Sequence, residues 1–446
     1  MKTPICAFAR NYAQSAPLRL HMPGHKGEPL VGFEPLDITE IDGADSLYEA
    51  SGIIQESEHN AGSLFGADTF YSTEGSSLCI RAMLHLLCLY ARAKGETPRV
   101  LAGRNAHKTF LSAAALLDFH IDWLYPAPGA SYLSCAVNAE TLEKALQTGE
   151  KPTAVYLTTP DYLGNLLDIQ TLAQVCHQYG VLLAVDNAHG AYLKFLSPSR
   201  HPMDLGADLC CDSAHKTLPA VTGSAYLHLN KALPSLFREQ AKNALALFGS
   251  TSPSYLILQS LDRVNAYLAD GYTEKLNAFT TKAQSLKDRL LAHGFTLMGD
   301  EPLKVTLLTK SYGWEGDALA GWLTEKGMFC EFCDRDHLVF MVTPETGEEG
   351  LARLEQALLA VPKRPPISEL PPPFGPAKQA MSIRQATMAP CEVLEIGQCK
   401  GRILASPSVG CPPAVPIVIC GEVMDHTTLR AFAYYGIQRC SVVKEC

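Results

Sequence analysis

The sequence predicts an α/β fold in which helices cover a mostly parallel sheet, followed by a smaller α+β domain and a C-terminal lobe. Between residues 78 and 229, short apolar runs alternate with longer segments whose apolar residues recur every three or four positions. This alternation is typical of parallel strands that are connected by helices. Residues 293–362 then mix short strand-like and helical patterns, and a proline-dense stretch separates them from the final segment.

The first half of the chain contains the elements of the predicted sheet. After an irregular N-terminal segment, apolar runs bounded by glycine, proline and polar residues indicate strands and helices in turn. Asp168 is a suitable N-cap for one helix, and Gly180 is suited to end it. The expected elements are a helix at Leu78–Ala93, strands at Arg99–Ala102 and Ala154–Leu157, a helix at Asp168–Tyr179, and strands at Val181–Val185 and Gly223–Leu229.

The second half of the chain begins with a long helical region. Tyr255–Leu291 should be largely helical and should connect two domains, and Leu351–Val361 should form a helix of the smaller domain. The prolines that follow have the composition of a semi-rigid linker. The predicted organisation is an N-terminal segment (1–60), a large domain (61–255), a small α+β domain (256–362), a Pro-rich linker (363–377) and a C-terminal domain (378–446).

Composition excludes several classes of protein. The chain has 446 residues, of which 47% are hydrophobic and 19% charged, as in soluble globular proteins. Its formal charge of −9 argues against a nucleic-acid partner. No apolar run is long enough for a membrane-spanning helix, and the first residues lack the apolar core of a signal peptide. We therefore expect a cytoplasmic protein with no membrane partner.

The chain contains 15 cysteines, which are scattered rather than arranged as a disulfide scaffold. In a cytoplasmic protein, we expect them to be reduced and mostly packed as small apolar groups. Cys330 and Cys333 have the spacing of a redox or zinc motif, but no second such pair completes a tetrahedral site. We expect a structural role for this pair, strand packing for Cys210 and Cys211, and no metal.

Lys216, within Ser213-Ala214-His215-Lys216, is the strongest functional signal in the chain. Thirty positions earlier, Asp186 follows the apolar run of a predicted strand. An enzyme that uses pyridoxal phosphate (PLP) needs a lysine that forms a Schiff base with the PLP aldehyde. It also needs an acid that keeps the pyridine nitrogen protonated. The order and context of the two residues resemble those of aspartate aminotransferase-like PLP enzymes of fold type I.

A PLP site must also hold a phosphate and cover a ring. Ser76 and Ser77 follow Gly75 at the start of a predicted helix, where hydroxyls and free N–H groups would bind a phosphate. By themselves these serines are typical helix caps, and the cofactor interpretation depends on Lys216 and Asp186. His107 follows a predicted strand, where its ring would lie on one face of the pyridine.

Further phrases extend the resemblance over nearly the whole chain. The sequence resembles the Orn/Lys/Arg decarboxylase family of fold-type I PLP enzymes, in its short form without an N-terminal wing domain. The matching phrases are Leu20–Gly27 (LHMPGHKG), Asp37–Gly43 (DITEIDG), Gly75–Ser77, Asn105–Lys108, Asp186–Gly190, Ser213–Lys216, Ser250–Tyr255, Gly401–Ile403, Cys411–Pro416 and Gly421–Glu422.

The resemblance implies a role for each matching residue. Lys216 would carry the cofactor, Asp186 would pair with the ring nitrogen and His107 would stack on the ring. His189 would orient the cofactor or its phenolic oxygen. The residues implied to hold the phosphate are Ser76, Ser77, Ser213 and His215, with Thr251 or Ser252 from a neighbouring subunit. The large domain would thus bind PLP, and a homodimer or larger homo-oligomer is expected.

Two positions depart from the family pattern. Asn187 stands where the family often has glutamate, and we expect it beside the cofactor rather than in contact with it. Ala414 stands where the family usually has glycine. Because alanine does not take a positive φ cheaply, we expect a different local turn there.

The resulting hypothesis is the decarboxylation of a basic L-amino acid in polyamine metabolism, with arginine slightly favoured over lysine and ornithine. An aminotransferase or another fold-type I PLP lyase is an alternative. Such an aminotransferase commonly needs an arginine for the substrate carboxylate, and none in the last 80 residues or so stands out. A PLP-binding regulatory homologue without activity is a further alternative, although the set of site residues is complete.

Overall fold

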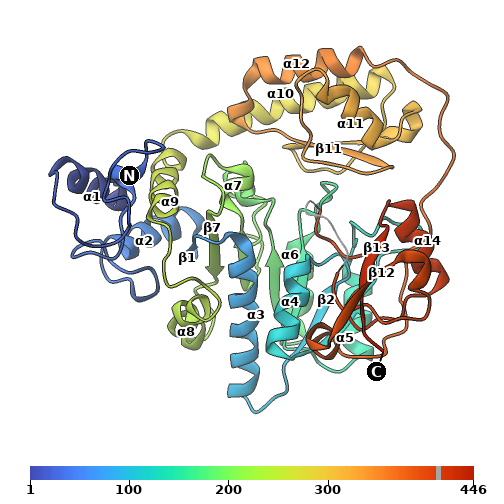
Figure 1. The fold of residues 1–446 in the computed structure, drawn as a ribbon, viewed down its shortest axis with the longest axis horizontal. Helices are drawn as coiled ribbons and strands as arrows, with labels where there is room; N and C mark the ends of the chain where they lie inside the picture. Colours follow the sequence, from blue (N-terminus) through green and yellow to red (C-terminus); the bar gives the residue numbers. More distant parts are fainter. Residues whose placement is uncertain (408–412, 446) are drawn as a thin grey trace. The chain divides into compact units, whose positions relative to one another are not determined.

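The chain folds into two units, each of which combines two stretches of sequence. Figure 1 shows the helices and strands along the chain. A computed structural model gives the structure of residues 1–407 and 413–445. The first unit comprises residues 1–98 and 169–276, and the second comprises residues 99–168 and 277–446. Seven strands, β1 to β7, belong to a mixed sheet. The five-part division drawn from the sequence stays a prediction.

The first unit contains four of these strands, in the order β1-β7-β6-β5. β5 and β6 are parallel, whereas β7 is antiparallel to both of its neighbours. Within the described residues, the strands are β1 (Asp68–Ser72), β5 (Leu182–Asp186), β6 (Leu209–Asp212) and β7 (Ala225–Leu229). The α-helices are α1 (Pro4–Gln14), α2 (Ile53–Phe65), α3 (Gly75–Ala93), α6 (Ile169–Gln178), α7 (Ala214–Thr217), α8 (Ser235–Ala246) and α9 (Tyr255–Leu268). The 3₁₀ turns are η1 (Glu34–Leu36), η2 (Leu47–Glu49) and η3 (Ala191–Phe195).

The parallel pair β5–β6 brings two functional segments together. β5 and β6 are fully or nearly fully buried, because their residues are apolar apart from the aspartates at their ends. Their register pairs Ala184 with Leu209 and Asp186 with Cys211. The carboxyl ends of parallel strands lie at one edge of a sheet, which is where α/β proteins bind ligands. Both Asp186 and the segment leading to Lys216 start from this edge.

The second unit contains three parallel strands in the order β4-β2-β3. They are β2 (Arg99–Gly103), β3 (His120–Leu124) and β4 (Ala154–Thr158). α4 (Lys108–Leu117) lies between β2 and β3 in the chain, and α5 (Ala139–Thr148) precedes β4. Asn138 and Thr141 form a capping box at the start of α5.

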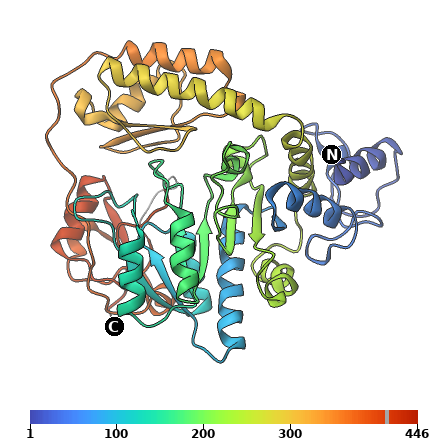
Figure 2. The ribbon, with the colours of Figure 1, turned by 180° about the vertical axis from the view of Figure 1, so that it is seen from behind.

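A four-stranded antiparallel sheet follows in the same unit, in the order β10-β11-β9-β8. Its strands are β8 (Leu297–Met298), β9 (Lys304–Leu308), β10 (Phe332–Cys333) and β11 (His337–Met341). The helices that accompany it are α10 (Tyr272–His293), η4 (Thr309–Tyr312), α11 (Gly316–Thr324), η5 (Pro344–Thr346) and α12 (Gly347–Leu359). α10 and α12 run side by side in both views (Figure 2). The ion pair between Arg289 and Glu355 joins these two helices.

The C-terminal lobe is built around a two-stranded sheet. Its elements are α13 (Ile383–Met388), β12 (Cys391–Glu395), η6 (Ile396–Gln398), α14 (His426–Tyr434) and β13 (Arg439–Val443). β12 and β13 are antiparallel. Leu404, Val418, Phe432 and Val442 form part of its buried core.

Most of the expected elements are present. The four strands and the helix Leu78–Ala93 are found with ends within two or three residues of those expected. The helical region 255–291 is interrupted, because α9 ends at Leu268 and Gly271 has a φ of +70°. Among the residues that the structure describes, none of the helices combines the length and hydrophobicity that crossing a lipid bilayer requires.

Candidate active site

Lys216 and His189 form the centre of the candidate site in the first unit. Lys216 lies on α7, directly after β6, and is half-buried. Its Nζ atom is 3.0 Å from Nε2 of His189, which is 5% exposed. His189 follows β5 by three residues, so the adjacent strands β5 and β6 bring the amine and the imidazole together. Lys216 and His189 were selected from two separate motifs of the sequence, and the structure places their side chains in contact.

Asp186 is the last residue of β5 and is almost completely buried. Its Oδ1 atom accepts hydrogen bonds from the backbone N–H of Ala188 at 3.2 Å and from the Cys211 thiol at 3.7 Å. A buried carboxylate at the end of a parallel strand is suited to pair with a protonated ring nitrogen. Burial raises the pKa of Cys211 well above its ordinary value, so this thiol stays protonated.

The serines predicted to hold a phosphate come together at the start of α3. The Ser213 hydroxyl donates to Oγ of Ser76 at 2.8 Å. α3 begins at Gly75, which has a φ of +70°, and no side chain caps the helix. Ser76 and Ser77 therefore occupy a helix N-terminus of the kind that binds anions.

His215 lies beside this helix start. A Cβ atom built on Gly75 would be 3.9 Å from Cε1 of His215. Nδ1 of His215 is 2.9 Å from the carbonyl oxygen of Ser224. Because a carbonyl only accepts hydrogen bonds, Nδ1 carries the hydrogen.

Two further hydroxyls support the fit of a phosphorylated cofactor. Oγ1 of Thr217 and Oγ of Ser224 are buried and have no hydrogen-bond partner among the described residues. Thr217 follows Lys216 in the chain, and Ser224 provides the carbonyl that binds His215. Hydroxyl and imidazole groups donate well to phosphate oxygens, and an amine and a carboxylate suit the two ends of PLP. The residues present thus fit PLP.

His107 and Thr251 are the remaining residues that the sequence predicted for the site. His107 belongs to the second unit, where it is the N-cap of α4, and its Nδ1 atom accepts from the backbone N–H of Thr109 at 3.1 Å. Thr251 is exposed in the segment 250–254. The backbone N–H of Ser250 donates to Glu74 at 2.6 Å, which ties that segment to the start of α3.

Two N-terminal phrases are joined by His25. Its Nε2 atom is 3.2 Å from a carboxylate oxygen of Asp37, and its Nδ1 atom accepts from the backbone N–H of Gly27 at 2.9 Å. Since Nδ1 is an acceptor, Nε2–H is the donor to Asp37. His25 thus connects the phrases Leu20–Gly27 and Asp37–Gly43.

A buried polar network around Asp212 was missed in the sequence. Asp212 is completely buried four residues before Lys216, and its carboxylate binds Asn187 at 2.7 Å, His201 at 2.9 Å and His228 at 3.1 Å. Burial alone would raise the pKa of Asp212, but the two histidines outweigh burial and hold this pKa well below its ordinary value. Burial lowers the pKa of His228.

This network also explains the departure at position 187. Asn187 is completely buried and donates to Asp212. Gly190 is required next to it, because a Cβ atom there would come within 2.0 Å of Oδ1 of Asn187. In the sequence, the one sign of this network was the aspartate directly before the Ser-x-His-Lys phrase. Its position does not identify the residues that it binds.

The second departure, at Ala414, was predicted wrongly. Ala414 has a φ of +54°, so it takes the left-handed conformation that the sequence analysis did not expect of alanine. Its carbonyl oxygen accepts from the backbone N–H of Lys108 at 2.8 Å, and the residue is completely buried. Tertiary contacts hold the strained backbone in place. Cys411 and Pro412 of the same phrase lie outside the described residues.

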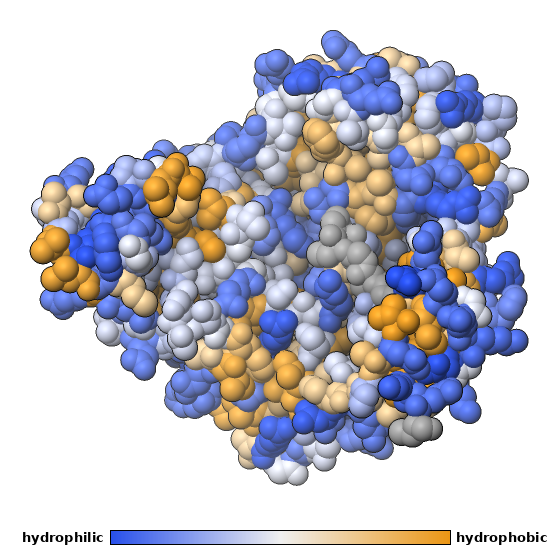
Figure 3. Space-filling view, in the orientation of Figure 1, coloured by the Kyte–Doolittle hydropathy of each residue, from blue (hydrophilic) through white to orange (hydrophobic). Residues whose placement is uncertain are grey.

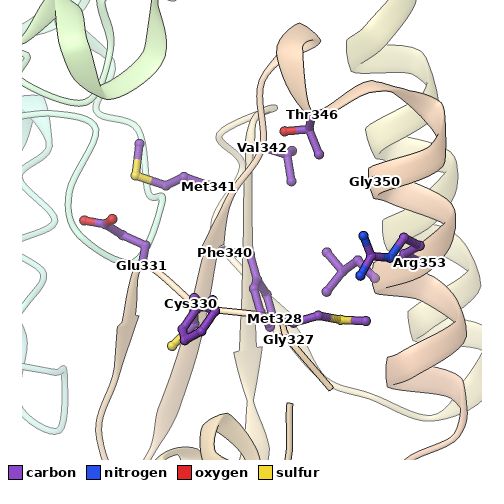
Figure 4. A pocket seen from close by; sticks show the side chains of 12 residues that line it. Gly327, Met328, Cys330, Glu331, Phe340, Met341, Val342, Thr346, Gly350 and Arg353 are labelled. Carbon is purple, nitrogen blue, oxygen red and sulfur yellow. The ribbon is translucent and has the colours of Figure 1, made fainter. Parts of the chain in front are cut away.

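Cys330 and Cys333 are half-buried in the second unit. Neither belongs to a group of three potential metal ligands among the described residues. Cys330 lines a cavity of about 330 Å³ beside β11 and α12, together with Phe340 and Arg353 (Figure 4). None of the residues predicted to bind PLP is among the described residues that line this cavity.

Comparison with known proteins provides an independent test. The family described as "Orn/Lys/Arg decarboxylase, major domain" matches residues 3–296. An uncharacterized protein of Bacillus subtilis, YaaO, is 28% identical, with 95% of this chain and 92% of that protein covered. An arginine decarboxylase of the same organism is 27% identical, with 96% and 92% covered. Lysine decarboxylase A from Pseudomonas aeruginosa has a TM-score of 0.80 at 17% identity, with 99% of this chain and 80% of that structure covered.

The structural match confirms the predicted fold. The solved structures that match include a lysine decarboxylase and an enzyme with PLP bound, and the mixed seven-stranded sheet with its helices agrees with the fold-type I architecture. At 17% identity, the match to the solved structure shows only that the folds are alike. The match to the family model is separate evidence, and it covers more than half of the chain.

Proposed function

Because the chain belongs to the Orn/Lys/Arg decarboxylase family, we propose that it decarboxylates a basic L-amino acid, with arginine as the favoured substrate. The chain is a decarboxylase, and the family and fold imply PLP as its cofactor. The observation that carries the proposal is the contact between Lys216 and His189 at the edge of the sheet, next to the buried Asp186. The relative named arginine decarboxylase, which covers nearly the whole chain, supports arginine.

Each residue would have a defined task. Lys216 would hold PLP covalently through its amine, and Asp186 would keep the ring nitrogen protonated. Ser76, Ser77, Ser213 and His215 would bind the phosphate, and His107 would cover one face of the ring. When bound, PLP supplies an electron sink for the electron pair that remains when the carboxylate of the substrate leaves as CO2.

His189 and Lys216 are suited to proton transfer. At a separation of 3.0 Å, the imidazole and the amine can share a proton directly. After CO2 has left, Cα of the product needs a proton, and Lys216 or His189 would supply it. Asp186 and His189 are 2% and 5% exposed, so water has little access to these two side chains.

The test is to incubate the PLP-loaded protein separately with L-arginine, L-lysine and L-ornithine and to measure both CO2 and the amine formed. We expect the highest kcat/KM with arginine. A clearly higher kcat/KM with lysine or ornithine would reject arginine but keep the reaction. Amino transfer to a keto acid without CO2 release would reject decarboxylation.

A lysine variant completes this test. Lys216→Ala should lose both the visible absorbance of bound PLP and all turnover, whereas Lys231→Ala, at an exposed position, should keep both. Turnover that survives Lys216→Ala would contradict the proposed role of this lysine.

We also propose that the enzyme is a homodimer or a larger homo-oligomer in the cytoplasm, acting in polyamine metabolism. Leu18, Leu20 and Leu30 expose 84%, 83% and 84% of their surfaces. Figure 3 shows apolar surface on the N-terminal part of the molecule. Exposed apolar patches commonly mark protein interfaces. A second copy of the chain would cover these residues, and its Thr251 would then assist phosphate binding.

The oligomer is tested by light scattering after size-exclusion chromatography. We expect at least a dimer for the wild type and a smaller species for Leu20→Ser/Leu30→Ser. A monomeric wild type would reject the proposal.

A further inference from the structure

The turn that carries His107 is fastened to the C-terminal segment by three hydrogen bonds. Nη1 of Arg104 donates to the carbonyl oxygen of Pro416 at 2.9 Å, and Nη2 donates to that of Ile417 at 3.1 Å. At the other side of the turn, the backbone N–H of Lys108 donates to the carbonyl oxygen of Ala414 at 2.8 Å. Three consecutive contacts thus join residues 104–108 to residues 414–417.

Arg104 is held in an unusually enclosed environment. Its side chain is 2% exposed, and its guanidinium group lies 3.5 Å from the carboxylate of Glu422, which is 3% exposed. Trp123 and Phe374 lie 5.5 and 5.2 Å from the guanidinium carbon, as ring centroids. The planar, branched guanidinium group can bind two carbonyls and stack on aromatic rings together, which the single ammonium group of lysine cannot.

Glu422 is itself fixed by the C-terminal lobe. Its Oε2 atom accepts from the backbone N–H of Ile419 at 2.8 Å, and its backbone pairs with Leu404. The ion pair between Arg104 and Glu422 therefore connects the end of β2 to a residue that the folded lobe holds in place. Removal of either partner would leave the other charge buried without its counter-ion, which is costly.

His107 lies between the two anchored positions. Its Nδ1 atom accepts from the backbone N–H of Thr109, so the imidazole is fixed to α4, and Arg104 and Lys108 fix the turn on both sides. We infer that Arg104 is a positioning residue, which fixes the orientation of the His107 ring through its contacts with Pro416 and Ile417. The inference rests on the proposed function, since it assumes that His107 covers the PLP ring.

The test compares PLP affinity with stability in three arginine variants. Arg104→Met should weaken PLP binding to the apoenzyme on the order of tenfold or more, since small displacements of a positioned group have effects of this size. Arg104→Lys should rescue the affinity only in part. Arg402→Met is the matched control, because Arg402 binds Glu392 and the Val443 carbonyl within the same lobe. It should leave PLP affinity unchanged even where it lowers the unfolding midpoint.

A double-mutant cycle separates positioning from a general loss of structure. In a His107→Ala background, Arg104→Met should add little further loss of PLP affinity, because its effect passes through His107. An equal loss in both backgrounds would overturn the inference, and so would a folded Arg104→Met protein with wild-type affinity. If Arg104→Met does not fold, Arg104→Met/Glu422→Gln removes both buried charges and allows the same measurements.

The outcome is distinguishable from failure of the proposed function. Loss of PLP affinity in Arg104→Met, with no CO2 from any basic amino acid in the wild type, would keep the positioning role and reject the reaction. CO2 release by the wild type, together with unchanged PLP affinity in Arg104→Met, would support the reaction and reject the positioning role.

Discussion

The amide of Asn187 donates a hydrogen bond to Oδ1 of Asp212 across 2.7 Å, and both side chains are completely buried. Asn187 follows Asp186 at the end of β5, and Asp212 ends β6 four residues before Lys216. The bond therefore fixes the two strand ends that carry the acid and the lysine. His201 and His228 occupy the other oxygen of Asp212, so the carboxylate stays charged.

Asn187→Asp should lower the free energy of unfolding at pH 7 by about 3 kcal/mol, because it buries a second negative charge next to Asp212. The new carboxyl would have a folded-state pKa above its unfolded value. Its penalty should therefore be largest above that folded-state pKa and should shrink as the pH falls and the group binds a proton. Urea unfolding at several pH values measures this change.

Asn243→Asp is the control, since Asn243 is exposed on α8. It should change stability by less than about 0.5 kcal/mol. An Asn187→Asp protein as stable as this control at pH 7 would show that Asp212 does not hold a buried negative charge.

His228 should make stability fall on acidification. Burial lowers its pKa below the ordinary value of 6.5, so the unfolded chain binds the proton more readily than the folded protein. The stability contributed by the neutral imidazole is complete above the unfolded pKa and is lost as the pH falls through the folded pKa. His228→Gln should therefore show a smaller decrease in the free energy of unfolding than the wild type between about pH 7.5 and pH 5.5. His120→Gln, at an exposed position, should keep the wild-type slope.

His189→Gln should reduce kcat by about 10²-fold, because it removes a titratable partner 3.0 Å from the Lys216 amine. The pH profile of kcat should also lose one of its limbs, which a merely structural effect would not produce. His177→Gln provides a control in the same unit, since His177 is exposed and pairs with Asp208 at 3.0 Å. A His189→Gln enzyme with an unchanged pH profile would contradict a role in proton transfer.

Cys330 should be the more reactive thiol of its pair. A hydrogen bond from Cys333 lowers the pKa of Cys330 to about 7, so much of this thiol is ionised at neutral pH. Cys333→Ala should slow alkylation of Cys330 by iodoacetamide at pH 7 by about tenfold or more, as followed by peptide mass spectrometry. The rate at the exposed Cys391 serves as an internal reference. Equal rates with and without Cys333 would exclude this activation.

The sequence was sufficient to select candidate residues whose positions are determined locally, and their roles stay a prediction. Lys216, Asp186 and the serines were recognisable because each follows a strand or begins a helix, and these elements are determined by nearby apolar patterns. The break between α9 and α10 was also marked, by Gly271, although the sequence analysis treated the region as one helical stretch.

The remaining features depend on contacts between distant segments. Asp212 binds His201 and His228, 11 and 16 residues away, and Arg104 binds a segment more than 300 residues away. The spacing of apolar residues along a sequence does not indicate which distant polar residues will be in contact. Ala414 shows the same limitation for the backbone, since its left-handed conformation depends on its surroundings and not on its own preference.

The Pro-rich stretch 363–377 contains neither helix nor strand, and Leu370 within it exposes 81% of its surface. A protease should therefore cut here first and leave the rest of the second unit intact. The covalent tether would be lost, but the C-terminal lobe would still bind the residues around Arg104. The linker would then have contributed a high local concentration of the lobe, in addition to the contact between Phe374 and Arg104. A nicked enzyme should run as one species on a native gel and as two bands under denaturing conditions.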